Sequence, residues 1–135
     1  MASARITLVQ GTSRDFLIDL TDDQGQAIPE ELLVGAVGEF FLRVLPTDVA
    51  NLLYFNTTTD LLKLAFVCSS LKLSFDSADS ATLPIATDTW QLVVTLANGD
   101  RLVAIEWSPF DITLGGVTAP VAPVFTNTIK IDHNY

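Results

Sequence analysis

Residues 90–107, WQLVVTLANGDRLVAIEW, predict a β-hairpin around which the rest of the chain folds. Asn98 and Gly99 separate two apolar runs, and an Asn-Gly pair best tolerates the positive φ angles of a two-residue type I′ turn. Such a turn would set the register of the two strands. It would place Trp90 opposite Trp107 in the core, on one face with the pairs Leu92/Ile105, Val94/Val103 and Leu96/Arg101.

Short segments with the period-two alternation of half-buried strands recur along the rest of the chain. Residues 14–20, RDFLIDL, and residues 70–75, SLKLSF, show it most regularly. Turn residues separate such segments, and Gly35 and Gly38 disfavour a long helix. The sequence therefore predicts an all-β fold, an antiparallel β-sandwich of the Ig-like or jelly-roll-like kind, with no helix longer than two turns. Further strands are expected over residues 6–10, 39–45, 51–55, 62–66 and 110–114.

Two other segments predict single helical turns. Pro29 precedes Glu30 and Glu31, which is a favourable start for a helix. Residues 76–83, DSADSATL, begin with Asp and Ser, which can cap a helix, and they end before a proline. Both helices would be short connections between strands.

The chain is expected to divide into a sandwich domain, residues 1–114, and a C-terminal arm, residues 115–135. The arm begins with GGVTAPVAPVF, whose Gly, Pro, Val and Ala composition predicts an extended linker. A strand is expected next, and we expect it to dock on the open sheet edge of a neighbouring subunit or partner protein. A disordered end and a strand that returns to its own sheet are the alternatives. The four residues of this expected strand are Thr128, Ile129, Lys130 and Ile131.

The composition limits the classes of partner. Apolar residues make up 49% of the chain and charged residues only 17%, against roughly 25% charged in an average soluble domain. Part of this apolar surface is expected to pack against other subunits, which predicts a homo-oligomer. No apolar run approaches the length of a membrane-spanning helix, so membrane insertion is not expected. The net charge is −9 and the seven basic residues are scattered, so nucleic-acid binding is not expected either.

No set of residues predicts catalysis or a bound metal. His133 is the only histidine and lies close to the end, which is unsuitable for a rigidly held base. Cys68 shares an apolar face with its neighbours and is expected to be a buried, unreactive thiol. Asp19, Asp22 and Asp23 could attract calcium, but their spacing is not that of an EF-hand loop. The chain is therefore not expected to be an enzyme or to hold a cofactor or metal.

Exposed aromatic residues would be needed for binding of a carbohydrate. Trp90 and Trp107 could stack on a sugar, although their expected register favours core packing. The other candidates are Tyr54, Phe55 and Tyr135. A carbohydrate-binding module therefore stays open as an alternative.

Five segments in order resemble the N-terminal β-sandwich domain of phage baseplate upper proteins and related virion accessory proteins. They are ITLVQGTSRDFLIDLTDDQGQAI, LVGAVGEFFLRV, FDSADSATLP, WQLVVTLANGD and FDITLGG, which together span about residues 5–115. The resemblance rests on the order of the segments and on their turn residues.

This resemblance implies a structural virion protein without an active site. Such a domain would dock or anchor parts of the tail, baseplate or fibre attachment apparatus, with other virion proteins as its partners and the virion as its location. The same sandwich could instead decorate a capsid, which is the alternative within this class.

Overall fold

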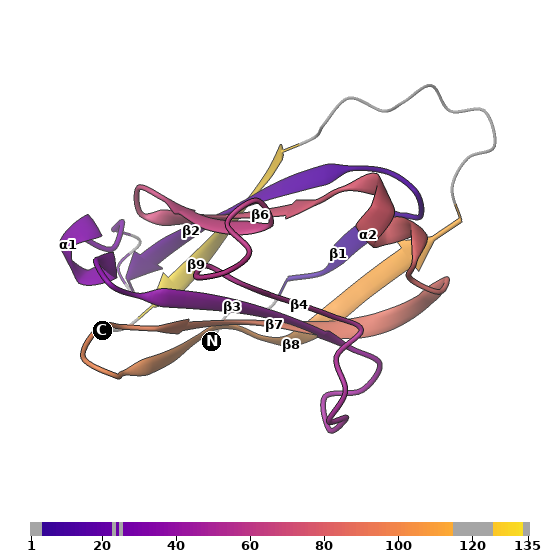
Figure 1. Ribbon diagram of the computed structural model, residues 1–135. Helices are drawn as coiled ribbons and strands as arrows, with labels where there is room; N and C mark the ends of the chain where they lie inside the picture. Colours follow the sequence, from indigo (N-terminus) through magenta and orange to yellow (C-terminus); the bar gives the residue numbers. More distant parts are fainter. Residues whose placement is uncertain (1–3, 23, 25, 115–125, 134–135) are drawn as a thin grey trace.

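The computed structural model describes residues 4–22, 24, 26–114 and 126–133, and for Asp22 and residues 126–133 it describes the backbone alone. Two β-sheets lie face to face, and two short helices join strands (Figure 1). The five-stranded sheet has the order β1 (Ile6–Val9), β8 (Arg101–Thr113), β7 (Ala86–Thr95), β3 (Val37–Arg43) and β4 (Leu53–Asn56). The four-stranded sheet has the order β5 (Leu64–Val67), β6 (Ser70–Phe75), β2 (Arg14–Asp22) and β9 (Thr126–His133).

The all-β prediction is confirmed. The described helices are α1 (Glu30–Leu33) and α2 (Ser77–Ala81), so each is a single turn, as expected. The predicted antiparallel pairing holds except at two edges, where β1 runs parallel to β8 and β2 runs parallel to β9. Both parallel pairs join strands far apart in the sequence, which a hairpin pattern does not reveal.

Aromatic rings from both sheets form the centre of the core. Phe75 of β6 lies 5.5 Å from Phe40 of β3 and 5.6 Å from Phe110 of β8, measured between ring centroids. Trp90 of β7 is fully buried beside Phe40, and its indole Nε1 donates a hydrogen bond of 2.8 Å to the carbonyl oxygen of Ala4. This bond satisfies the one polar atom that the ring brings into the core.

The β7–β8 hairpin has a different turn from the one that Asn98 and Gly99 predict. Gly99 has φ +96°, but Asn98 does not have the positive φ that a type I′ turn requires. The amide of Gly99 donates to the carbonyl of Leu96, and the amide of Leu96 donates to the carbonyl of Asp100. This is a three-residue loop, a type I turn followed by a left-handed glycine. The extra residue shifts the register, and Thr95 pairs with Arg101.

Two β-bulges in β8 change the register again. Leu92 pairs with Ile105, as predicted, but Trp90 pairs with Ser108. Glu106 and Trp107 therefore lie together opposite the single residue Gln91. Because two residues oppose one, the strand turns Trp107 to the outer face and keeps the following even-numbered residues in the core. The predicted pairing of Trp90 with Trp107 is wrong because of this bulge. The predicted pairs Val94/Val103 and Leu96/Arg101 are wrong because of the three-residue loop, since Val94 pairs with Leu102 and Thr95 with Arg101.

We expect substitutions in this turn to distinguish the two turn types. Gly99→Ala should lower the free energy of unfolding by about 1 kcal/mol, because alanine is strained at positive φ. Asn98→Gly should also destabilise, since it removes the bond from the Asp100 amide to Asn98 Oδ1 and adds chain entropy at a residue that needs no positive φ. Chemical denaturation measures both. A type I′ turn would instead tolerate Asn98→Gly without loss, and that result would contradict the observed turn.

The C-terminal strand returns to the chain's own sheet. Residues 126–133 form β9, which pairs with β2 along its whole length, with Ile129 opposite Ile18. The strand expected at Thr128–Ile131 is thus present. It returns to its own sheet, which is one of the alternatives to docking on a neighbour that the sequence leaves open. Strand β9 covers an edge of β2 whose backbone groups would otherwise lack partners. The expected linker, residues 115–125, lies outside the described residues, and a contact of Thr128–Ile131 with a partner stays a prediction.

Candidate functional site

The outer face of the five-stranded sheet carries a group of aromatic side chains around one arginine. In β3, Phe40 and Leu42 point into the core, so Phe41 and Arg43 point outward. Tyr54 of β4 pairs with Phe41. Trp107 reaches the same face through the bulge in β8 and contacts Arg43. We call these four residues, Phe41, Arg43, Tyr54 and Trp107, the outer aromatic face.

Arg43 is held in place by its neighbours. Its guanidinium carbon lies 5.2 Å from the centroid of the Trp107 ring and 5.6 Å from that of the Phe41 ring. Its Nε donates a hydrogen bond of 2.6 Å to Asn51 Oδ1. No carboxylate in the described part of the chain lies within ion-pair distance of it. The site therefore presents a positive charge that is fixed by stacking and still available to an anionic group.

Tyr54 completes the face at the edge strand β4. Its ring lies 5.2 Å from that of Phe41 at an interplanar angle of 49°, and 39% of the residue is exposed. Its hydroxyl donates a hydrogen bond of 2.7 Å to Glu39 Oε2. Partial burial, together with Glu39, raises the pKa of Tyr54. The phenol thus stays neutral and amphipathic at neutral pH, which suits a contact residue.

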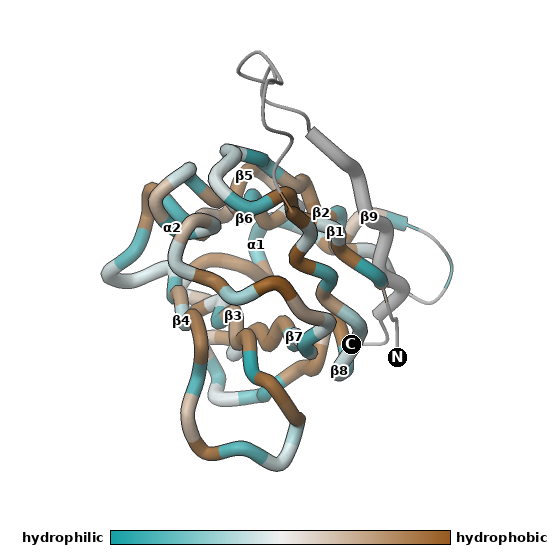
Figure 2. The backbone as a smooth tube through the Cα atoms, turned by 90° about the vertical axis from the view of Figure 1, so that its right-hand side faces the viewer, coloured by the Kyte–Doolittle hydropathy of each residue, from teal (hydrophilic) through white to brown (hydrophobic). Residues whose placement is uncertain are grey.

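An apolar loop adjoins this face. Residues 44–52, which we call loop 44–52, link β3 to β4 and project away from the sheets (Figures 1 and 2). Val44, Leu45 and Val49 are exposed by 48%, 56% and 94%. Arg43 joins the loop to the face, because its guanidinium also approaches the carbonyl oxygen of Pro46. Arg43 thus brings the exposed apolar side chains of the loop next to the outer aromatic face, where Glu39 is bonded to Tyr54.

The geometry favours a protein partner over a sugar. Arg43 stacks against both Phe41 and Trp107, and Tyr54 is tilted against Phe41, so the rings do not form a flat free platform. Tyr, Trp and Arg are the residues most enriched at the centres of protein–protein interfaces. The arrangement is therefore suited to docking of a protein surface.

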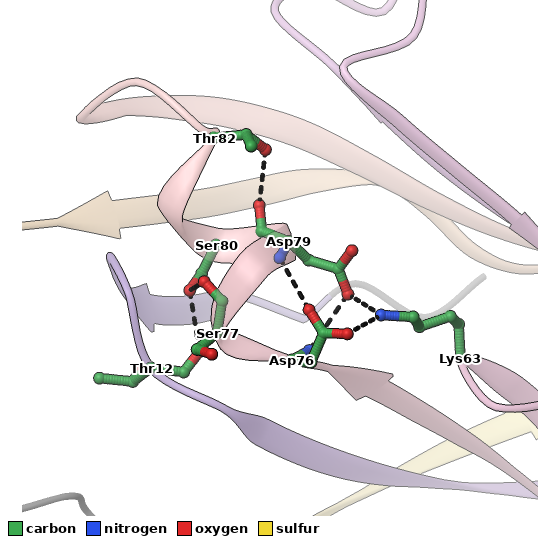
Figure 3. A network of polar contacts seen from close by, with 7 residues as sticks. All are labelled: Thr12, Lys63, Asp76, Ser77, Asp79, Ser80 and Thr82. Carbon is green, nitrogen blue, oxygen red and sulfur yellow. Dashed lines mark hydrogen bonds and ion pairs between the residues drawn. The ribbon is translucent and has the colours of Figure 1, made fainter.

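A second group of polar side chains surrounds α2 (Figure 3). Asp76 caps this helix: its carboxylate accepts from the amide of Asp79, and the carboxylate of Asp79 accepts from the amide of Asp76. The Lys63 ammonium bonds to both carboxylates. Ser80 Oγ donates to the carbonyl oxygen of Thr12 at 2.8 Å. Every group thus has a partner within the chain, so this network ties α2 to two neighbouring loops and has a structural role.

Replacing Asp76 with alanine should destabilise the protein by about 1 kcal/mol, because the helix loses its capping side chain. The Lys63 ammonium, and then the Asp79 amide, lower the pKa of Asp76. Stability linked to this group is therefore present above about pH 4, the ordinary pKa range of an aspartate, and is lost as the pH falls toward the lowered pKa. Urea denaturation at neutral and acidic pH measures the difference, which should shrink in acid. If the difference in the free energy of unfolding between the wild type and Asp76→Ala grew in acid, this role would be contradicted.

The structure separates the residues that sequence analysis proposed as candidates. Trp90 is in the core, Asn98 and Gly99 form the hairpin turn, and Trp107 lies outside. Cys68 is exposed, with φ +54° in the turn between β5 and β6. The prediction of a buried thiol is wrong because the strand ends one residue before it.

The remaining candidates are not brought together. Tyr54 is exposed, but Phe55 is buried in the core. Asp23, the side chains of Asp22 and His133, and Tyr135 lie outside the description. Within the described residues, no group of three His, Cys, Asp or Glu side chains is arranged to hold a metal ion. None of the described helices is long and apolar enough to cross a membrane.

Sequence analysis missed Phe41 and Arg43 as functional residues. The signal was present in residues 39–45, EFFLRVL, which are apolar on both faces of the expected strand. A strand of that kind is covered on both sides. A scan against protein-family models and a search of curated proteins both find no match to this chain.

Proposed function

We propose that this chain is a structural virion protein, a β-sandwich module that docks parts of a phage tail, baseplate or fibre attachment apparatus. The observation that carries the proposal is the outer aromatic face with loop 44–52, whose aromatic, arginine and exposed apolar side chains suit contact with protein. The virion as its place rests on the sequence resemblance described above. Capsid decoration is the alternative role for the same surface.

We also propose that the sandwich is of the Ig-like rather than the jelly-roll kind. The order β8-β7-β3-β4 in one sheet corresponds to the order G-F-C-C′ of a variable-type Ig domain. The order β5-β6-β2 in the other sheet corresponds to D-E-B. Strand β9 takes the edge place beside β2, where an Ig domain has its first strand. This assignment supports a binding module, because the faces and loops of such sandwiches commonly carry recognition.

Immunogold labelling of phage particles purified from cells that express this protein tests the proposed function. We expect label on the tail, baseplate or fibres, whereas label spread over the head would favour capsid decoration. Particles that contain none of the protein would contradict both roles.

A reconstitution experiment tests the surface itself. Particles assembled without the protein are mixed with purified wild type, Arg43→Glu or Arg101→Glu. The wild type and Arg101→Glu should attach, because Arg101 is exposed beside the hairpin turn and lies outside the outer aromatic face. Arg43→Glu should attach at least about tenfold more weakly, as expected when a fixed charge at an interface is reversed. Equal attachment of all three proteins would show that another surface docks.

The carbohydrate alternative has its own test. Binding to an array of bacterial surface glycans is measured for the wild type and for Tyr54→Ala. We expect no binding above background by either protein. Glycan binding by the wild type that is lost in Tyr54→Ala would favour a carbohydrate-binding module instead.

A further inference from the structure

We infer that the outer aromatic face pairs with the same face of a second copy of this chain, around a two-fold axis. The inference rests on the docking role proposed for this surface and names its first partner. It does not depend on where in a virion the protein lies.

The outer aromatic face carries one cation, Arg43, and beside it lie two carboxylates, Glu39 and Glu106, of which Glu39 already accepts the hydrogen bond from Tyr54. Arg43 has no carboxylate partner among the described residues, and Glu106 has no basic partner among them. Glu106 occupies the bulge next to Trp107, opposite Gln91, and is half-buried. Because the two bulge residues oppose a single outward residue, Glu106 lies on the same side of the sheet as Trp107 and Arg43.

A two-fold contact satisfies both charges at once. In such a contact, Arg43 of one copy can meet Glu106 of the other, and the reverse pair forms by symmetry. Each copy carries a net charge of −9, so association of most other faces would bring like charges together. The outer aromatic face is suited to self-association because Arg43 and the neighbouring Glu106 both lack ion-pair partners among the described residues and lie beside exposed aromatic side chains.

The aromatic side chains of the outer aromatic face adjoin these charges. Phe41, Tyr54 and Trp107 would lose their remaining contact with water, which is the main driving force for association. Arg43 would lose little conformational freedom, because its stacking and its bond to Asn51 already hold it. The centre of the contact would thus have the aromatic and arginine side chains that dominate binding energy elsewhere.

The size of the surface fits a dimer. Adjacent strands lie about 4.8 Å apart and a strand rises about 3.3 Å per residue, so the outer face offers on the order of 500 Å² in projection. Loop 44–52 extends it with three exposed apolar residues. A stable interface buries roughly 800 Å² per partner, so loop 44–52 has to take part in the contact.

Sedimentation equilibrium with charge-reversed variants tests the inference. The wild type should dimerise, and Arg43→Glu and Glu106→Arg alone should each raise the dissociation constant about tenfold or more. Mixing the two single variants should restore association, because each then supplies the charge that the other lacks at both pairs. Rescue by mixing is not expected from a purely structural effect of either substitution. Leu62→Ser, at a residue that is 90% exposed outside this surface, is the control and should dimerise like the wild type.

Fluorescence gives a second, local measurement. Trp90→Phe leaves Trp107 as the only tryptophan, and this residue lies on the proposed interface. Its emission should shift to shorter wavelength as the protein concentration rises through the dissociation constant, because the indole leaves water. A wild type that stays monomeric, a dimer that Arg43→Glu leaves intact, or mixed variants that stay apart would each overturn the inference.

The result separates the two proposals. A monomeric protein that still needs Arg43 to attach to particles would reject the second copy and keep the docking role. A dimer with the expected charge dependence that is absent from particles would keep the second copy and reject the virion role.

Discussion

Trp90→Ala is expected to lower the free energy of unfolding by about 3–5 kcal/mol, the range for removing a large aromatic side chain from a core. Trp90 is fully buried, lies 5.9 Å from Phe40 between ring centroids, and bonds to the Ala4 carbonyl. The substitution leaves a cavity and also leaves that carbonyl without its donor. Denaturant titration should show a lower midpoint with an unchanged slope, since the fold itself is kept.

Trp107→Ala is the matched control. Trp107 is half-buried on the outer face and contacts Arg43 there. Its removal should lower the free energy of unfolding by only about 1 kcal/mol, because only partial burial and a cation–π contact are lost. If both tryptophans were neighbours in the core, as the simple hairpin predicts, the two losses would be equal. Equal losses would therefore contradict the bulge opposite Gln91.

The strands could be predicted because their pattern is local. Residues 70–75 alternate apolar and polar side chains, and they form β6 with the expected face buried. The capping of α2 could likewise be predicted, because the segment begins with Asp76 and Ser77. Such features depend on neighbours in the sequence, and period and turn chemistry are enough to find them.

The register of the hairpin could not be predicted from the turn alone. A three-residue loop and a two-residue turn can share the same Asn-Gly pair, and the choice between them shifts every later pair. One signal was available: Ile105 is at an odd position and Phe110 at an even one, yet both are apolar. A strand that buries both must contain an extra residue between them, and the structure has it at Glu106 and Trp107. The order of the strands in each sheet could not be predicted either, because the parallel pairs join strands that are distant in the sequence.

The candidate site depended on that same bulge. With a regular register, Trp107 would point into the core, and no aromatic face would form around Arg43. The run EFFLRVL still indicated that Phe41 would be covered, because both faces of the strand are apolar. One face is covered by the core of this chain. The other face has no such cover among the described residues, which is why the proposed contact is placed there.

Asp88→Asn is expected to raise the free energy of unfolding at pH 7 by about 1–2 kcal/mol, because it removes a buried charge that has no partner. Asp88 lies on the inner face of β7 and is only 2% exposed. Its Oδ2 has no hydrogen-bond partner among the described residues. Burial raises the pKa of this carboxyl, because the charged form loses its water. Asparagine has nearly the same shape and carries no charge at any pH.

The pH dependence follows from the direction of that shift. Below the ordinary pKa of an aspartate, about 4, both the folded and unfolded states hold the proton and the group has no linked effect. As the pH rises toward the raised pKa, only the unfolded state releases its proton readily, so the wild type loses stability. The gain from Asp88→Asn should therefore grow from about pH 4 toward neutrality, as measured by urea denaturation at a series of pH values.

Asp111 on the neighbouring strand provides a control with the opposite sign. The hydrogen bond from Arg5, and then that from Thr87, lower the pKa of Asp111. Stability linked to Asp111 is present above about pH 4 and is lost as the pH falls, so Asp111→Asn should destabilise at pH 7 and matter less in acid. The two substitutions remove the same charge within one sheet. If both shifted stability in the same direction, net charge would explain the effect, and the buried, unpartnered carboxyl of Asp88 would not.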